Sequence, residues 1–185
     1  HCMSLRVDYY GAARMAMKHL TDNGHTQIAY IGSNFPPLYS QQTFEGYRSA
    51  LEEQNIVVPL SWIQMQSKDS DGEDSAEKQM QAILQSGAMP TAVFCAADIY
   101  AIGAIRALKQ AGLRVPSDVS VIGIDDVLSS KYLIPSLTTM AVDRQEMGRL
   151  GIELLQKAIN GEPCQSVVLP QCKLIVREST AEPRK

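Results

Sequence analysis

The sequence SVIGIDDVLSSKYLIPSLTT, residues 120–139, decides how this chain folds. Its first part, Val121–Ile124, is a short apolar run rich in β-branched residues, which is typical of a central strand buried on both faces of a parallel sheet. The run ends at two carboxylates, Asp125 and Asp126. Ligands of open parallel sheets lie beyond the carboxyl ends of the strands, so we expect Asp125 to face a ligand site.

Strand and helix patterns alternate on both sides of this stretch. The patterns predict strands over residues 28–32, 62–65, 91–95 and 120–124, helices over 11–23, 44–54, 75–85 and 99–110, and a polar, proline-bearing loop over 33–42. This alternation predicts an α/β fold with a doubly wound parallel sheet. After Pro135 the rhythm changes to a strand over residues 138–142, a long amphipathic helix over 144–160, two short closing strands over 166–169 and 173–177, and a polar tail.

The composition is that of an ordinary globular protein. Its 17 basic and 20 acidic side chains give a net charge of −3, which argues against binding of a polyanion by the net field of this chain. The four cysteines show no CxxC spacing, so reduced thiols in a cytoplasmic protein are expected. No apolar run approaches the roughly 20 residues that span a bilayer, so no membrane partner is expected. The chain begins with His1, which indicates a piece of a longer protein.

Two strand-end carboxylates are the candidate polar sites. Asp125 fits recognition of a small ligand and fits capping of the turn that follows about equally well. Asp98 follows the buried run TAVFCAA and precedes a helix, so an N-cap is favoured there over ligand contact. The two carboxylates could also hold Mg²⁺ in a small enzyme, although no paired DxD or recognisable catalytic lysine accompanies them.

Other motifs point away from an enzyme. In the acidic loop over residues 68–74 the glycine falls at the fourth place from Asp69, not the sixth, and no glutamate follows at the twelfth, so the loop does not fit a calcium loop. The sequence contains no glycine-rich phosphate loop, GxSxG elbow or HExxH motif. These absences favour a binding module with no cofactor and no metal.

Several segments together carry a family resemblance. They are GAARMAMKHLTDNGHTQIAYIG (residues 11–32), EGYRSALEEQNI (45–56), PTAVFCAADIYAIGAIRALKQAGLRVPSDVSVIGIDD (90–126), PSLTT (135–139) and LIVREST (174–180). In this order they resemble the effector-binding domain of lactose/galactose-repressor-type (LacI/GalR family) transcription regulators. The resemblance implies a periplasmic-binding-protein-like fold of type I with two lobes, a small-molecule effector between the lobes, and a homodimer. It also implies operator DNA binding through an N-terminal helix-turn-helix that these residues do not include.

The resemblance further implies that mainly one of the two lobes is present. Residues 1–8 would be the final strand of the N-terminal lobe and residues 9–135 the C-terminal lobe. Residues 136–160 would return to the N-terminal lobe, and residues 161–185 would be closing strands of the C-terminal lobe and a tail. The expected function is sensing of a small-molecule effector, a sugar or a related metabolite, for a DNA-binding regulator; the alternative is a periplasmic sugar-type solute-binding protein.

Site residues follow from the same resemblance. Asp125 matches an aspartate that hydrogen-bonds the effector. Thr43 stands where the family usually places a ligand-binding arginine, and Ala97 stands where sugar-binding members often have an asparagine before the position of Asp98. The implied ligand-binding residues are Asp125, Asp98, Tyr39, Thr43, Lys68 and Asp69, and the implied dimer-interface residues are Ile102, Tyr132 and Leu133.

Overall fold

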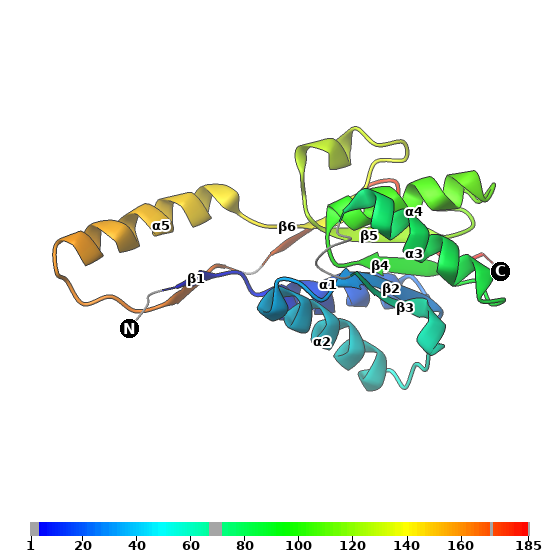
Figure 1. Ribbon diagram of the computed structural model, residues 1–185, viewed down its shortest axis with the longest axis horizontal. Helices are drawn as coiled ribbons and strands as arrows, with labels where there is room; N and C mark the ends of the chain where they lie inside the picture. The colour runs from blue at the N-terminus through cyan, green and yellow to red at the C-terminus, as the bar shows by residue number, and fades with distance from the viewer. Residues whose placement is uncertain (1–3, 67–71, 171, 185) are drawn as a thin grey trace.

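The computed structural model describes residues 4–66, 72–170 and 172–184, which form a main domain and an elongated extension (Figure 1). The main domain is built on a six-stranded sheet with the strand order β3-β2-β4-β5-β6-β8. The extension consists of helix α5 (Arg144–Ile159) and a two-stranded parallel sheet of β1 (Leu5–Arg6) and β7 (Val167–Val168). The two parts meet beyond one end of the main sheet.

The main sheet is parallel except at one edge. Its parallel strands are β2 (Ile28–Ser33), β3 (Ile63–Gln66), β4 (Ala92–Cys95), β5 (Ser120–Asp125) and β6 (Thr138–Ala141). The edge strand β8 (Lys173–Ile175) runs antiparallel to β6. Every residue of β2 and β4 is buried, as expected for strands covered on both faces. The predicted doubly wound α/β fold is confirmed.

Helices cover both faces of this sheet. Helices α1 (Tyr9–Asp22) and α2 (Pro37–Glu53) pack together on one face, and α3 (Glu73–Gln85) and α4 (Asp98–Gln110) pack together on the other (Figure 1). Short 3-10 helices, η1 (Leu60–Trp62) and η3 (Leu128–Lys131), lie in the connections. Helix α1 begins where the Asp8 carboxylate accepts a hydrogen bond of 2.8 Å from the amide of Gly11. In the described part of the chain, no helix combines the length and the apolar character that crossing a membrane requires.

Helix α2 begins earlier than the sequence pattern predicted. The predicted loop over residues 33–42 is wrong in its second half, because the helix starts at Pro37. A proline is well placed at the first position of a helix, where its missing amide hydrogen would have no intrahelical partner. The early start places Tyr39 on the first turn of α2, at the end of the sheet that faces the extension.

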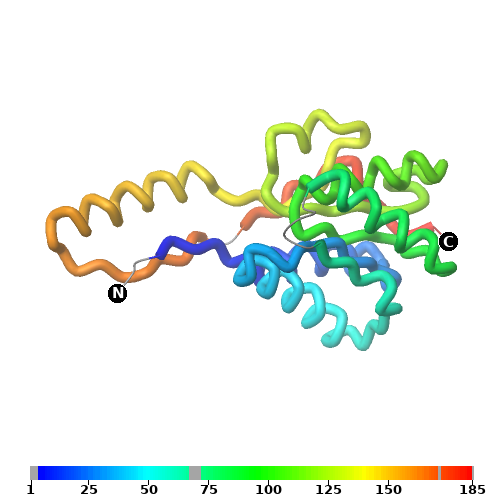
Figure 2. The backbone as a smooth tube through the Cα atoms, viewed as in Figure 1, coloured from blue at the N-terminus to red at the C-terminus, as the bar shows by residue number. Residues whose placement is uncertain are grey.

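The chain crosses between the main domain and the extension after β1, after β6 and after β7 (Figure 2). Strand β6 pairs with β5 in the main sheet, so the segment that we expected to leave the main domain at residue 136 leaves it only after Ala141. Strand β7 pairs with β1 in the extension and does not join the main sheet. The sheet pairing therefore places the extension at residues 4–6, 144–159 and 167–168.

Candidate functional site

The candidate site lies at the carboxyl ends of the parallel strands, between the main sheet and helix α5. Strand β5 ends at Asp125, whose backbone is paired with Ala141 of β6. The φ angle of Asp125 is +119°, and Asp126 follows with a φ of +52°. Residues other than glycine adopt positive φ at an energetic cost, and such strained residues concentrate at functional sites. The backbone thus holds Asp125 in a conformation that only the surrounding structure maintains.

The side chain of Asp125 has no partner within the part of the chain that the structure describes. Among the described residues, no hydrogen bond or ion pair involves its carboxylate. Burial raises the pKa of Asp125 from 3.8 to about 7, the nearby Asp98 adds to this increase, and Arg144 opposes it. A partly buried carboxylate without internal donors is well suited to accept hydrogen bonds from a bound molecule.

A cavity of about 430 Å³ lies next to this carboxylate. Its lining residues are Tyr9, Asp125, Val142, Arg144, Met147 and Gly148, which come from both the main domain and the segment that leads into α5. A second cavity of about 280 Å³ shares Tyr9 and Met147 with the first and is otherwise lined by Leu5, Arg6, Val7, Pro36, Leu38, Tyr39 and Gln42. Together they form a cleft with one polar end and a largely apolar remainder, as small-molecule sites commonly have.

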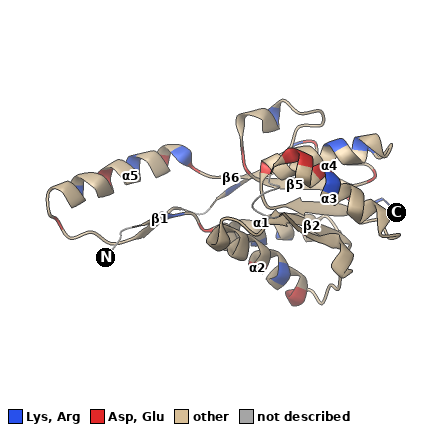
Figure 3. Cartoon of the chain, in the orientation of Figure 1, with Lys and Arg blue, Asp and Glu red and all other residues tan. Residues whose placement is uncertain are grey.

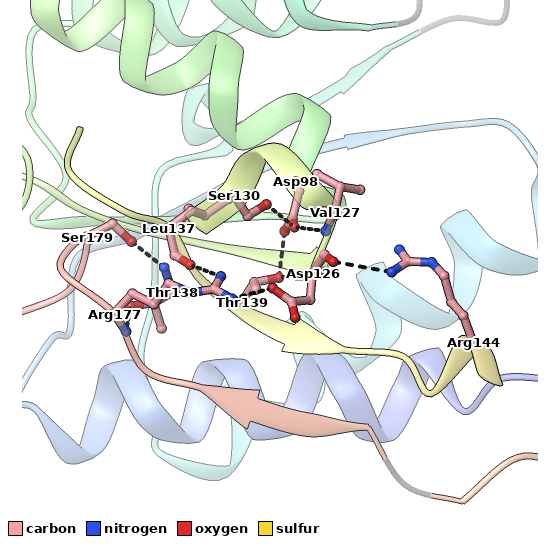
Figure 4. A network of polar contacts seen from close by, with 10 residues as sticks. All are labelled: Asp98, Asp126, Val127, Ser130, Leu137, Thr138, Thr139, Arg144, Arg177 and Ser179. Atoms are coloured by element: carbon pink, nitrogen blue, oxygen red, sulfur yellow. Dashed lines mark hydrogen bonds and ion pairs between the residues drawn. The ribbon is translucent and has the colours of Figure 1, made fainter. Parts of the chain in front are cut away.

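Asp98 is placed differently from Asp125. Its side chain is fully buried, and its carboxylate accepts hydrogen bonds from Ser130 Oγ at 2.6 Å, Thr139 Oγ1 at 2.5 Å and the amide of Val127 at 3.0 Å (Figure 4). The predicted N-cap role is wrong, because Ala97 occupies the cap position and the Asp98 side chain makes no cap hydrogen bond. Burial raises the pKa of Asp98, and the three hydrogen bonds act in the opposite direction.

Asp126 links the same turn to two distant arginines. Arg177 Nη2 lies 2.6 Å from Asp126 Oδ1, and Arg177 Nη1 donates to the carbonyl of Leu137 at 2.8 Å. From the first turn of α5, Arg144 Nη1 donates to the carbonyl of Asp126 at 3.2 Å (Figure 4). Sequence reasoning did not find Arg144 or Arg177, because nothing local to either residue indicates that it reaches this turn.

Tyr39 and Thr43 both lie on helix α2. The Tyr39 hydroxyl donates to the carbonyl of Ala96, and the Tyr39 ring meets Tyr9 edge-on with centroids 4.5 Å apart. Burial raises the pKa of Tyr39 well above its usual value. Thr43 is fully buried, and its hydroxyl contacts the hydroxyl of Tyr30 and donates to the carbonyl of Tyr39. Tyr39 lines the second cavity, whereas Thr43 lines neither cavity of the cleft.

The remaining predicted residues lie away from the cleft or outside the described residues. Lys68 and Asp69 lie outside the described residues. Tyr132 and Leu133 follow η3, where Tyr132 is 70% exposed, and Ile102 lies partly buried on α4. Exposed apolar neighbours accompany them; these are Ile99, Leu128 and Ile134. Within residues 4–66, 72–170 and 172–184, no three His, Cys, Asp or Glu side chains form a group that could hold a metal ion.

Comparisons with known proteins agree on one family. A family model described as periplasmic binding protein-like domain matches residues 17–180. The ribose operon repressor of Haemophilus influenzae is 38% identical over 168 residues, which are 89% of this chain and 49% of that protein. The HTH-type transcriptional repressor PurR of Mannheimia succiniciproducens is 36% identical over 166 residues, again 89% of this chain and 49% of that protein.

Solved structures give the same result. The lac repressor dimer bound to operator and an anti-inducer is similar with a TM-score of 0.86 and 29% identity, over 96% of this chain and 60% of that one. The chain spans about half the length of the curated relatives that it matches. These similarities cover both the main domain and the extension.

Proposed function

Because this chain belongs to the periplasmic binding protein-like domain family, in the form found in LacI-family regulators, we propose that it senses a small-molecule effector for a DNA-binding transcription regulator. The observation that carries this proposal is the Asp125 carboxylate, which has no hydrogen-bond or ion-pair partner among the described residues and is held at positive φ beside a cavity that the main domain and α5 share. The relatives are named as repressors, which supports a regulator over a periplasmic solute-binding protein or an enzyme.

The effector is proposed to bind in the cleft and to contact both parts of the molecule. Asp125 would accept hydrogen bonds from the effector, and the rings of Tyr9 and Tyr39 would cover its apolar faces. A ligand that touches the main domain and α5 together stabilises one relative placement of the two, because its affinity differs between placements. The regulator would report the effector through that change of placement.

Operator DNA is proposed to bind through a helix-turn-helix outside these 185 residues. The net charge of −3 supports this assignment, since DNA binding depends strongly on neutralising phosphates with basic side chains. Basic and acidic residues are interspersed along α5 rather than gathered by sign (Figure 3). A regulator of this kind acts in the cytoplasm, where its operator is.

A homodimer is proposed to form through the segment around η3. Leu128, Tyr132 and Ile134 are 73%, 70% and 94% exposed, and Ile99 at the start of α4 is also exposed. Clustered exposed apolar side chains are typical of an interaction surface. Ile102 and Leu133, which are partly buried in the monomer, would complete this interface.

The sensing role is tested by measuring operator affinity of the full-length gene product while titrating a library of sugars and nucleosides. At least one compound should change the operator Kd, and Asp125→Asn should remove the response while operator affinity without effector stays the same. Glu182→Gln, which neutralises an exposed carboxylate of the tail, is the matched control and should respond as the wild type does. If no compound in the library changes operator affinity, the sensing role is refuted.

The dimer is tested separately by sedimentation equilibrium. Tyr132→Asp places a charge in the exposed apolar surface and should raise the dimer dissociation constant at least tenfold, whereas Lys131→Asp at the neighbouring exposed position should change it much less. Equal dissociation constants for the wild type and Tyr132→Asp would place the interface elsewhere.

A further inference from the structure

Two charged side chains line the cavity next to Asp125, called the main cavity from here on, and they do not pair with each other. Of its six lining residues, Asp125 and Arg144 are the charged ones. Arg144 uses Nη1 to donate to the carbonyl of Asp126, and its Nε and Nη2 have no hydrogen-bond partner among the described residues. The carboxylate of Asp125 is equally free within that part of the chain. Opposite charges that share a cavity without pairing leave both available to a molecule placed between them.

We propose that the effector is an anionic, hydroxylated small molecule, a sugar acid or a sugar phosphate, whose anionic group binds Arg144 while a hydroxyl group donates to Asp125. This inference rests on the proposed function, because it names the chemical class that the sensing site takes. An arginine fork binds carboxylate and phosphate through two parallel hydrogen bonds, which gives strength and geometric selectivity. Arg144 is therefore a specificity-determining residue.

The main domain does not supply this cation at the position where the family resemblance leads us to expect it. Thr43 stands at the place of the usual arginine, and it is fully buried with its hydroxyl bound to helix α2. Ala97 offers no polar side-chain atom at the end of β4. Arg144, at the start of α5, lines the cleft, and Figure 4 shows its guanidinium reaching the carbonyl of Asp126.

The free charges around the cleft favour an anion. A third cavity of about 430 Å³ shares Val142 with the main one and contains Lys173, which has no ion-pair partner among the described residues. Its two acidic residues are already engaged, because Asp143 accepts from the amide of Glu146 and Glu146 pairs with Arg149 at 2.5 Å. The second cavity, which Tyr39 lines, contains one basic residue, Arg6. Three basic side chains thus line the three cavities, and of the acidic side chains there Asp125 is the one without a hydrogen-bond or ion-pair partner among the described residues.

The test compares matched probes on the full-length gene product by isothermal titration calorimetry. D-ribose, D-ribonate and D-ribose 5-phosphate form one series, and D-glucose, D-gluconate and D-glucose 6-phosphate form another. In at least one series an anionic member should bind at least tenfold tighter than its neutral member. Comparison of the carboxylate with the phosphate ester shows which anion the site prefers.

Variants then assign the effect to Arg144. Arg144→Met should weaken binding of the anionic probe at least tenfold and should change the affinity for the neutral sugar by no more than about twofold. Arg144→Lys should recover part of the lost anion affinity. Lys157→Met is the matched control, because Lys157 is an exposed basic residue of the same helix and lines none of the three cavities, so anion affinity should stay unchanged.

The outcomes separate this inference from the proposed function. The anionic class is overturned if a neutral sugar binds as tightly as the anionic members of its series, and if Asp125→Asn weakens binding of that sugar while Arg144→Met does not. The sensing role would remain in that case. Equal loss of anion affinity in Arg144→Met and Lys157→Met also overturns the anionic class, because the effect would then be one of net charge. If no probe binds and no library compound changes operator affinity, both proposals fail.

Discussion

Replacing Asp125 with asparagine is expected to stabilise the protein, because it removes a partly buried charge that has no partner among residues 4–66, 72–170 and 172–184. The pKa of Asp125 is raised from 3.8 to about 7, first by burial. At about 1.36 kcal/mol per pH unit, this difference corresponds to roughly 4 kcal/mol for a fully buried group. The carboxylate borders a cavity that is open to solvent, and screening reduces the cost. We therefore expect Asp125→Asn to raise the free energy of unfolding by about 2 kcal/mol at pH 8.

The sign of the effect with pH follows from linkage. Below about pH 3 the Asp125 carboxyl is mostly protonated in both the folded and the unfolded wild-type chain, so the variant gains almost nothing there. As pH rises towards 7, the unfolded chain loses this proton before the folded chain does, and the wild type loses stability relative to the variant. Above pH 7 the difference is constant.

Urea denaturation followed by circular dichroism at pH 4.5, 6, 7 and 8 measures this difference directly. The stability difference between Asp125→Asn and the wild type should grow from about 1 kcal/mol at pH 4.5 to about 2 kcal/mol at pH 8. Glu182→Gln, at an exposed position, should show no such growth. A gain that is equal at pH 4.5 and pH 8, or absent at pH 8, would refute the argument that Asp125 is an unpaired, partly buried carboxylate.

Four further substitutions test the structure by the same denaturation measurement or by thermal unfolding. Asp98→Ala leaves three buried donors unpaired and should cost about 3 kcal/mol. Gly123→Ala would place a Cβ 2.3 Å from Asp98 Oδ1 and should cost more than about 2 kcal/mol, whereas Gly148→Ala meets nothing within 4 Å and should stabilise α5 by about 0.5 kcal/mol. Burial lowers the pKa of His25, so stability should fall as pH drops below about 6.5, and His25→Gln should flatten that fall; an equally steep fall in the variant would assign it to other groups.

The fold of the main domain could be predicted because its signals are local. Each central strand is a short apolar run, each helix has an apolar stripe, and the alternation of the two leaves few arrangements open. The loop prediction over residues 33–42 failed at Pro37, since a proline was taken to interrupt structure where it opens a helix. The pairing of β1 with β7 could not be predicted, because two-residue strands carry no periodicity and lie about 160 residues apart.

The candidate site could be predicted only in part. The position of Asp125 after a buried strand is a local signal, and the structure places it beside a cavity. The ion pair between Asp126 and Arg177 joins residues that are 51 positions apart, and the approach of Arg144 depends on how the chain leaves β6 for α5. Neither contact has a local pattern, so the basic half of the site follows from tertiary structure alone.

Asp98 and Asp125 show what separates a structural carboxylate from a candidate binding carboxylate. Both follow buried strands and both precede a change of chain direction, so their sequence settings are nearly the same. In the structure, Asp98 receives three donors from the chain that follows β5, and Asp125 receives none among the described residues. A buried carboxylate with its donors supplied internally stabilises the turn around it, whereas one without them is costly unless another molecule supplies them. The energetic cost of the buried Asp125 carboxylate and of its strained backbone is therefore expected at a binding site and not in a purely structural turn.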